Sequence, residues 1–179
     1  MLERTSALAE AKTYTSPVLS ITERPGFTLT QVSGLDDGFE DKLSAIAGDV
    51  ALKVGVSHEH EGSTVMRIGP SQFWIVGPET DDAGVRLAGQ CAVTPLSHGR
   101  VRIAIEGAPA RDVLSKLMPL DFHPATFVPG HFAMTGIHHT PVTVHCTGEN
   151  AFDIYAMRSF ALNVWEVLTD AALEFAGTR

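Results

Sequence analysis

Large apolar residues alternate with polar ones through residues 100–106, where valine and isoleucine recur at every second position. This period of two is typical of a strand with one buried face. The following segment changes to the helical spacing i, i+3, i+4 and i+7, with apolar side chains at Ala110, Val113, Leu114 and Leu117. We therefore predict a strand followed by an amphipathic helix. The longest helical stripe lies in residues 160–175, which predicts a second helix there.

Two further regions are predicted to be hairpins. Residues 142–146 and 151–156 are alternating segments joined by four turn-forming residues, Thr-Gly-Glu-Asn. Residues 64–68 and 72–76 flank the turn Gly-Pro-Ser in the same way. Short links rich in turn formers between alternating segments indicate antiparallel pairing.

The order strand, helix, hairpin, helix occurs twice, in residues 26–90 and 99–175. Gly26 precedes the first strand of the first copy, and Gly99 precedes its counterpart 73 positions later. A duplicated segment of this size indicates a fold built from two similar halves. Strands that pair through hairpins, with helices over one face, predict an α+β protein with antiparallel sheets.

Length and periodicity also predict the domain organisation. Residues 1–25 are polar with weak periodicity and are interpreted as an N-terminal tail. Residues 26–179 are predicted to form a single α+β domain from the two repeats, because 179 residues suit two intimately packed halves better than two independent domains.

Charge and cysteine content narrow the function classes. The formal net charge is −8, and the 13 Lys and Arg residues form no basic stripe, which argues against nucleic acid as a partner. No apolar run approaches the roughly 20 residues of a membrane span, and the N-terminus lacks the apolar core of a signal peptide. We expect a cytoplasmic protein. Its two cysteines are interpreted as reduced thiols.

Several segments, spread over most of the chain, together form a recognisable series. They are residues 4–8, 67–70 with 73–74, 96–107, 112–114, 119–124, 147–152 and 158–161. In this order they resemble the gamma subunit of heterotetrameric sarcosine oxidase. That family has the folate-binding fold of the glycine-cleavage aminomethyltransferases, whose core is itself a duplicated α+β unit. The resemblance therefore implies the fold that the repeat predicts independently.

The resemblance also implies a role in a larger enzyme. The complex oxidises sarcosine to glycine, passes the one-carbon unit to tetrahydrofolate and forms hydrogen peroxide. In that family the FAD, FMN, NAD and tetrahydrofolate sites are assigned to the larger subunits. We therefore expect alpha, beta and delta subunits as partners, and no catalytic, cofactor-binding or metal-binding residue in this chain. The alternative is a stand-alone folate-binding or aminomethyltransferase-like protein, although the sequence lacks the additional C-terminal domain that such enzymes use.

A third hypothesis concerns metal binding by His58 and His60. In an extended strand the two imidazoles would share one face, as Zn²⁺ or Ni²⁺ ligands sometimes do. The segment lies beside glycines and serines, and isolated pairs of this kind are common by chance. We therefore favour a solvated loop.

The other histidine pairs are given structural interpretations. His138 and His139 would point to opposite faces if extended, so they are predicted to mark the end of a strand before Pro141. His145 and Cys146 lie within a predicted hairpin. One of two neighbours in a strand normally faces the core, so we interpret Cys146 as packing and His145 as a surface residue.

No nucleophilic triad is evident in the sequence. Ser97 and His98 are neighbours, yet a serine and its base must meet through a hydrogen bond with a third group holding the base. Cys91 and Cys146 have candidate histidine partners somewhere in the chain, but so would most proteins with eight histidines. We therefore expect none of these four residues to be catalytic.

The strongest candidates for recognition are Asp121 and His123, which lie in a loop made stiff by two prolines. An equally good interpretation is that the Asp121 side chain caps a turn or a helix. Trp74 and Trp165 are interpreted as core residues or as anchors at a subunit interface.

Overall fold

The chain is described by a computed structural model that covers residues 5–34, 38–48, 50 and 53–176. It divides into two compact units. The larger unit comprises Met1–Pro25 and Gly99–Arg179, and the smaller unit comprises Gly26–His98. The boundaries fall at Gly26 and Gly99, the two glycines that begin the predicted repeats.

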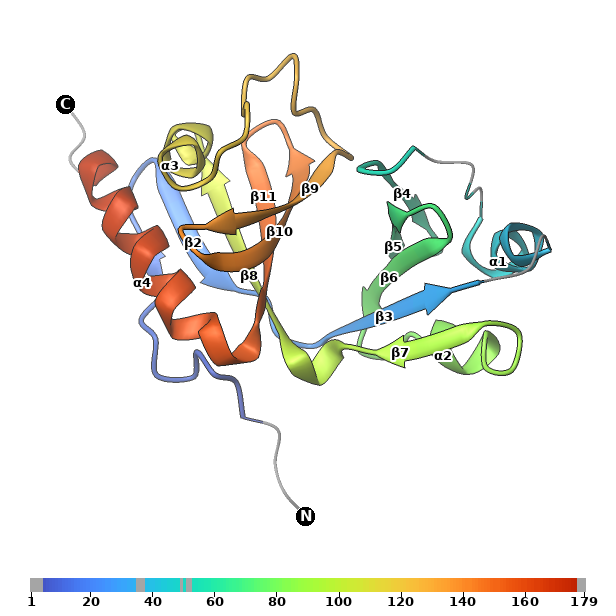
Figure 1. Ribbon diagram of the computed structural model, residues 1–179. Helices are drawn as coiled ribbons and strands as arrows, with labels where there is room; N and C mark the ends of the chain where they lie inside the picture. The colour runs from blue at the N-terminus through green and yellow to red at the C-terminus, as the bar shows by residue number, and fades with distance from the viewer. Residues whose placement is uncertain (1–4, 35–37, 49, 51–52, 177–179) are drawn as a thin grey trace. The chain divides into compact units, whose positions relative to one another are not determined.

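The larger unit contains a six-stranded antiparallel sheet in the order β1-β2-β8-β11-β10-β9. Figure 1 labels its strands from β2 to β9. Its strands are β1 Tyr14–Thr15, β2 Leu19–Glu23, β8 Arg100–Gly107, β9 Phe132–Ile137, β10 Thr140–Gly148 and β11 Ala151–Met157. Its helices are α3 Ala110–Leu117 and α4 Ala161–Ala172. Short 3-10 turns, η2 Arg158–Phe160 and η3 Leu173–Phe175, flank α4.

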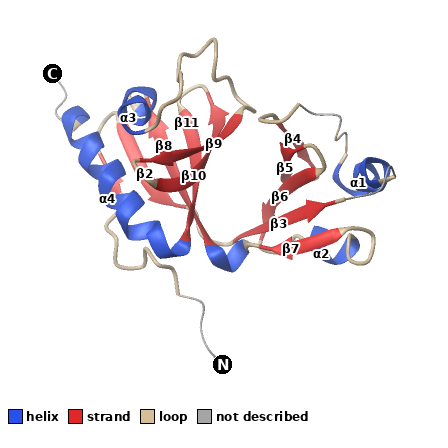
Figure 2. Cartoon of the chain, in the orientation of Figure 1, coloured by secondary structure: helices blue, strands red, loops and turns tan. Residues whose placement is uncertain are grey.

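The smaller unit contains a five-stranded antiparallel sheet in the order β4-β5-β6-β3-β7. Its strands are β3 Phe27–Ser33, β4 Ser57–His60, β5 Ser63–Gly69, β6 Gln72–Pro78 and β7 Ala92–Pro95. Its helices are α1 Phe39–Ala47 and α2 Ala83–Arg86, and the 3-10 turn η1 Ser97–Gly99 follows β7. Figure 2 shows the same alternation of strands and helices along both units. The predicted α+β class with antiparallel sheets is confirmed.

The two units share one topology. The element order β3-α1-β4-β5-β6-α2 in the smaller unit corresponds to β8-α3-β9-β10-β11-α4 in the larger one. The strand orders β4-β5-β6-β3 and β9-β10-β11-β8 correspond in the same way. The first strand of each repeat also pairs with a strand that lies before the other repeat in the sequence. β2 precedes the first repeat and pairs with β8 of the second, and β7 precedes the second repeat and pairs with β3 of the first. The duplication thus includes an exchange of strands that the sequence did not indicate.

The prediction that residues 1–25 form a tail is wrong for β1 and β2. Residues 1–4 lie outside the described residues, whereas Leu19 and Ile21 are buried and β2 pairs with β8 over five positions, from Leu19↔Gly107 to Glu23↔Ile103. A Cβ atom at Gly107 would lie 2.1 Å from the Val18 carbonyl oxygen, and the φ of this glycine is +136°. Only glycine permits so close an approach. The prediction of one folding domain from both repeats stays a prediction.

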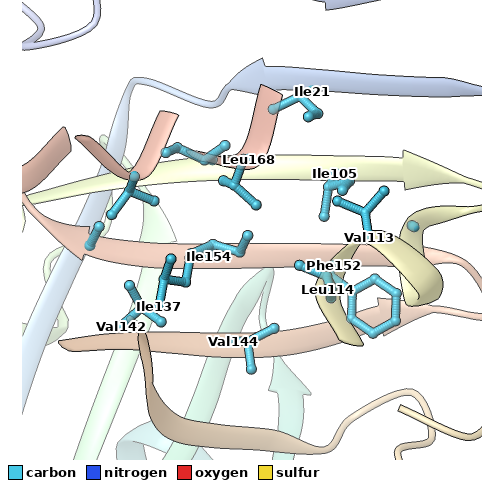
Figure 3. Packing of buried hydrophobic residues seen from close by; sticks show 14 of the residues in the cluster. Ile21, Ile105, Val113, Leu114, Ile137, Val142, Val144, Phe152, Ile154 and Leu168 are labelled. Carbon is cyan, nitrogen blue, oxygen red and sulfur yellow. The ribbon is translucent and has the colours of Figure 1, made fainter. Parts of the chain in front are cut away.

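The core of the larger unit lies between its sheet and its two helices. It includes Ile103 and Ile105 of β8, Ile154 of β11, Val113 and Leu114 of α3, and Leu168 of α4. All of these except Ile103 are labelled in Figure 3. Each of these side chains has essentially no exposed surface, and full burial of one contributes roughly 1.5–3 kcal/mol. Because Ile103 and Ile105 point to this core, Arg102 and Glu106 lie on the opposite face of the sheet.

Candidate functional site

A buried arginine fixes the loop that follows α3. Arg111, in the first turn of α3, is only 8% exposed. Its Nη1 donates to the carbonyl oxygens of Phe122 at 2.7 Å and Phe127 at 3.0 Å, and its Nε donates to the Glu149 carbonyl oxygen at 2.9 Å. The guanidinium also lies over the Phe152 ring, 5.1 Å from its centroid. One side chain therefore joins the loop to α3 and to the turn between β10 and β11.

The loop places Asp121 and His123 in a turn of their own. The Asp121 Oδ1 accepts a hydrogen bond from the His123 backbone N–H at 2.9 Å, and the His123 Nδ1 accepts one from the Ala125 N–H at 3.2 Å. The His123 N–H, followed by the Thr126 side chain, holds the pKa of the Asp121 carboxyl below its usual range. The turn-capping interpretation of Asp121 is thus confirmed, and both side chains are exposed.

The second face of the larger sheet carries an ionic network that follows from strand register. In the pairing of β11 with β8, Asp153 lies opposite Ala104 and Tyr155 lies opposite Arg102. In the pairing of β10 with β11, His145 lies opposite Asp153. Residues directly opposite one another in an antiparallel pair share a face of the sheet. The register therefore brings polar side chains from three strands onto one face.

Asp153 is the centre of this network and is fully buried. Arg102 Nε and Nη2 donate to its Oδ2 at 2.9 and 2.6 Å, and Arg24 Nη1 lies 3.5 Å from its Oδ1. Arg24 also pairs with Glu106. Two guanidinium groups thus balance two carboxylates. Removing one member of such a pair usually costs about 3–5 kcal/mol, because it leaves a buried charge unmatched.

His58 and His60 lie in β4, so the prediction of a solvated loop is wrong. The serines and glycines on both sides are typical of a loop, so the sequence did not indicate this short strand. It pairs with β5, where His58 lies opposite Val65. The ring centroids are 6.5 Å apart, and His58 Nε2 lies 2.9 Å from the Ala47 carbonyl oxygen. Within the described part of the chain, no three or more His, Cys, Asp and Glu side chains are placed to hold a metal ion.

Ser97 is engaged by the backbone of β3. Its hydroxyl oxygen accepts a hydrogen bond from the Leu29 N–H at 2.9 Å, which ties η1 to that strand. His98 is exposed beside it. Of the two thiols, Cys91 is partly exposed and Cys146 is buried. Burial raises the pKa of the Cys146 thiol, although the nearby Arg111 guanidinium opposes this shift.

Burial decides the predictions for His145 and the two tryptophans, and the backbone decides the one for His138. His145 is only 4% exposed, so its assignment to the surface is wrong, since both faces of β10 are covered at this point. Trp74 and Trp165 are also buried, and Trp74 Nε1 donates to the Gln31 Oε1 at 3.1 Å. They are core residues. His138, which has a φ of +52°, lies in the turn between β9 and β10, as predicted.

Sequence reasoning missed the groups that hold this region together. Arg111 interrupts an otherwise apolar helical stripe, and Asp153 interrupts the apolar residues of β11. A charged residue at an inward-facing position signals a buried ionic or hydrogen-bonded group, because such residues are almost never fully buried unless they are paired. The signal was present in the periodicity, but the partners lie at least 11 residues away along the chain.

Comparison with known proteins establishes the family. The family model described as the GCVT N-terminal domain matches residues 60–178, about two thirds of the chain. "Sarcosine oxidase subunit gamma" of Corynebacterium sp. (strain P-1) is 30% identical over 145 residues, which cover 78% of this chain and 71% of that protein. This chain belongs to the sarcosine oxidase gamma-subunit family. The protein of the same name from Corynebacterium sp. (strain U-96) is also 30% identical, over 142 residues, covering 76% of this chain and 66% of that protein.

Solved structures agree with the gamma-subunit family. A chain of heterotetrameric sarcosine oxidase from Corynebacterium sp. U-96 matches with a TM-score of 0.88 and 26% identity, over 98% of both chains. Glycine cleavage system aminomethyltransferase T from Bartonella henselae matches with a TM-score of 0.66 and 20% identity, over 86% of this chain and 46% of that one. The second likeness shows the fold alone. The predicted relation to the folate-binding fold is confirmed.

None of the described helices of this gamma-family chain is both long enough and apolar enough to cross a bilayer.

Proposed function

We propose that this gamma-family chain is a non-catalytic subunit of a heterotetrameric sarcosine oxidase and that it works in the cytoplasm. The likeness to a chain of such a complex carries the proposal, with a TM-score of 0.88 and 26% identity. The relatives that share 30% identity with this protein are named as gamma subunits.

The reaction of the assembled complex would be carried out by the companion chains. Alpha, beta and delta subunits would bind FAD, FMN, NAD and tetrahydrofolate, oxidise sarcosine to glycine and form hydrogen peroxide. In the gamma-family chain the best-defined polar groups have structural partners. Arg111 holds three backbone carbonyls and Asp153 is matched by two arginines, which supports a scaffolding role.

Co-expression with the other three subunits tests the proposal. We expect the chain to co-elute with them in size-exclusion chromatography, and the purified complex to release hydrogen peroxide when sarcosine is added. A chain that elutes separately from an otherwise active assembly would refute the subunit role.

The stand-alone folate-binding alternative has one observation in its favour, the match to the GCVT N-terminal domain over residues 60–178. Calorimetric titration of the isolated chain with tetrahydrofolate separates the two functions. We expect no heat of binding for a scaffolding subunit, whereas micromolar affinity would favour the alternative.

A further inference from the structure

The outward side of α4 borders two hollows of the larger unit. The first lies between α4 and the end of α3, measures about 700 Å³ and is lined by Leu117, Val167 and Leu173 among others. The second lies between α4 and the N-terminal segment, measures about 550 Å³ and is lined by Leu162 and Trp165 among others. Glu166 and Thr169 line both hollows, so they form the ridge that separates them.

Two leucines stand at the ends of this ridge. Leu162 is 53% exposed and Leu173 is 59% exposed. They are 11 residues apart, which is three helical turns and about 16 Å, so they lie on one side of the helix. Single exposed apolar residues are ordinary, but two on one stripe, each bordering a hollow, form a pattern typical of an interaction site.

The charge around the ridge is negative. Glu10, Glu166 and Asp170 line the two hollows, against one basic residue, Lys12. Within the described residues neither Glu166 nor Asp170 forms a salt bridge, whereas Glu174 of the following turn is paired with Lys116.

Helix polarity strengthens this negative potential. Asp170 lies in the last turn of α4, which carries no basic residue. The partial negative charge at a helix C-terminus disfavours a carboxylate and favours a cation at that position. An arginine or lysine supplied from outside the chain would therefore be stabilised there.

We propose that the α4 ridge, defined as Leu162, Glu166, Thr169, Asp170 and Leu173 with its two hollows, is a docking surface for a segment of another subunit. That segment would place apolar side chains in the hollows and lysine or arginine opposite Glu166 and Asp170. The inference rests on the proposed subunit function. A second copy of this chain is disfavoured as the occupant, because a symmetric contact would bring the same carboxylates together.

Assembly of the complete complex with gamma-chain variants tests the ridge. We expect Leu162→Asp combined with Leu173→Asp to weaken binding of the gamma chain by roughly tenfold or more, as loss of central apolar anchors does at other interfaces. Glu166→Lys combined with Asp170→Lys should weaken it by a similar factor at low salt, and by less at high salt. The matched controls are Val85→Asp and Glu61→Lys in the smaller unit, where the side chains are 77% and 71% exposed. Both controls should bind as the wild type does.

Hydrogen exchange provides a measurement that needs no variant. We expect the amides of α4 and η3 to exchange more slowly in the complex than in the free chain. If the wild-type chain assembles while both ridge variants bind normally and α4 exchange is unchanged, the docking surface is wrong although the subunit function stands. If the wild-type chain does not assemble, both are wrong. A dimer of the isolated chain that the leucine variant dissociates would assign the ridge to a second copy and overturn the proposal.

Discussion

Replacing Arg111 by methionine should unfold the loop after α3 and destabilise the larger unit. Methionine keeps the apolar contact with the Phe152 ring but donates no hydrogen bond. Three backbone carbonyls, those of Phe122, Phe127 and Glu149, would lose their donor. Each buried acceptor left without a partner costs about 1–3 kcal/mol.

The sum of these costs, roughly 3–9 kcal/mol, is an upper range. Residues 123–126 of the loop are exposed, so a shifted loop can let water reach its carbonyl groups. We therefore expect the free energy of unfolding to fall by about 3–5 kcal/mol. Arg111→Lys should recover less than half of this loss, because a single ammonium cannot reproduce the planar fork that reaches several acceptors.

Urea-induced unfolding of the full chain measures the effect, with the fluorescence of Trp165 reporting on the core of the larger unit. Hydrogen exchange supplies a local measurement, since the amides of Thr126 and Phe127 both donate to the His123 carbonyl oxygen and should lose protection together. The matched control is Arg86→Met, whose exposed side chain pairs with Asp82 on the helix surface and should contribute less than about 0.5 kcal/mol. A loss below about 1 kcal/mol for Arg111→Met, with unchanged exchange in the loop, would refute the reasoning.

Three further predictions concern single residues. Asp153→Asn should lower the free energy of unfolding by about 3–5 kcal/mol, because Arg24 and Arg102 lose the carboxylate that balances their charge. In the same denaturation assay Glu106→Gln should cost less than about 1 kcal/mol, because the Glu106 side chain is partly exposed. A thiol reagent should label Cys91 rapidly and Cys146 only after unfolding, since burial raises the pKa of the Cys146 thiol; equal labelling rates in the native protein would contradict this. The pKa of Asp121 in the folded chain lies below its ordinary value of 3.8, so the ionised carboxylate stabilises the folded state at pH values above 3.8. This contribution is lost as the pH falls through the lower pKa of the folded state. The difference in unfolding free energy between the wild type and Asp121→Asn should therefore shrink in acid, and a difference independent of pH would rule out the turn as its cause.

Local periodicity predicted most elements of both units. The alternation through residues 100–106 became β8, the helical spacing that follows became α3, and the last amphipathic stripe became α4. The strands that sequence reasoning missed are β1, β2, β4 and β7, all short or near the edge of a sheet. Short strands carry few alternating positions, so their pairing partners decide whether they form.

The repeat shows where similarity in sequence stops predicting structure. Gly34 and Gly107 occupy corresponding positions, yet a Cβ atom at Gly34 would meet the Phe39 ring at 1.9 Å, whereas one at Gly107 would meet the Val18 backbone. The same residue thus serves a helix contact in one unit and an exchanged strand in the other. The residues packed against each glycine in the tertiary structure therefore determine why a larger side chain does not fit there.

The amino-acid sequence by itself determined the α+β class, the duplication and the likeness to the gamma-subunit family, because these depend on periodicity and on the order of local motifs. Only the tertiary structure decided that β2 and β7 exchange between the repeats, that Arg111 and Asp153 find partners far along the chain, and that Leu162 and Leu173 share one exposed ridge. Such contacts depend on strand register and helix packing, which bring together residues that no local pattern relates.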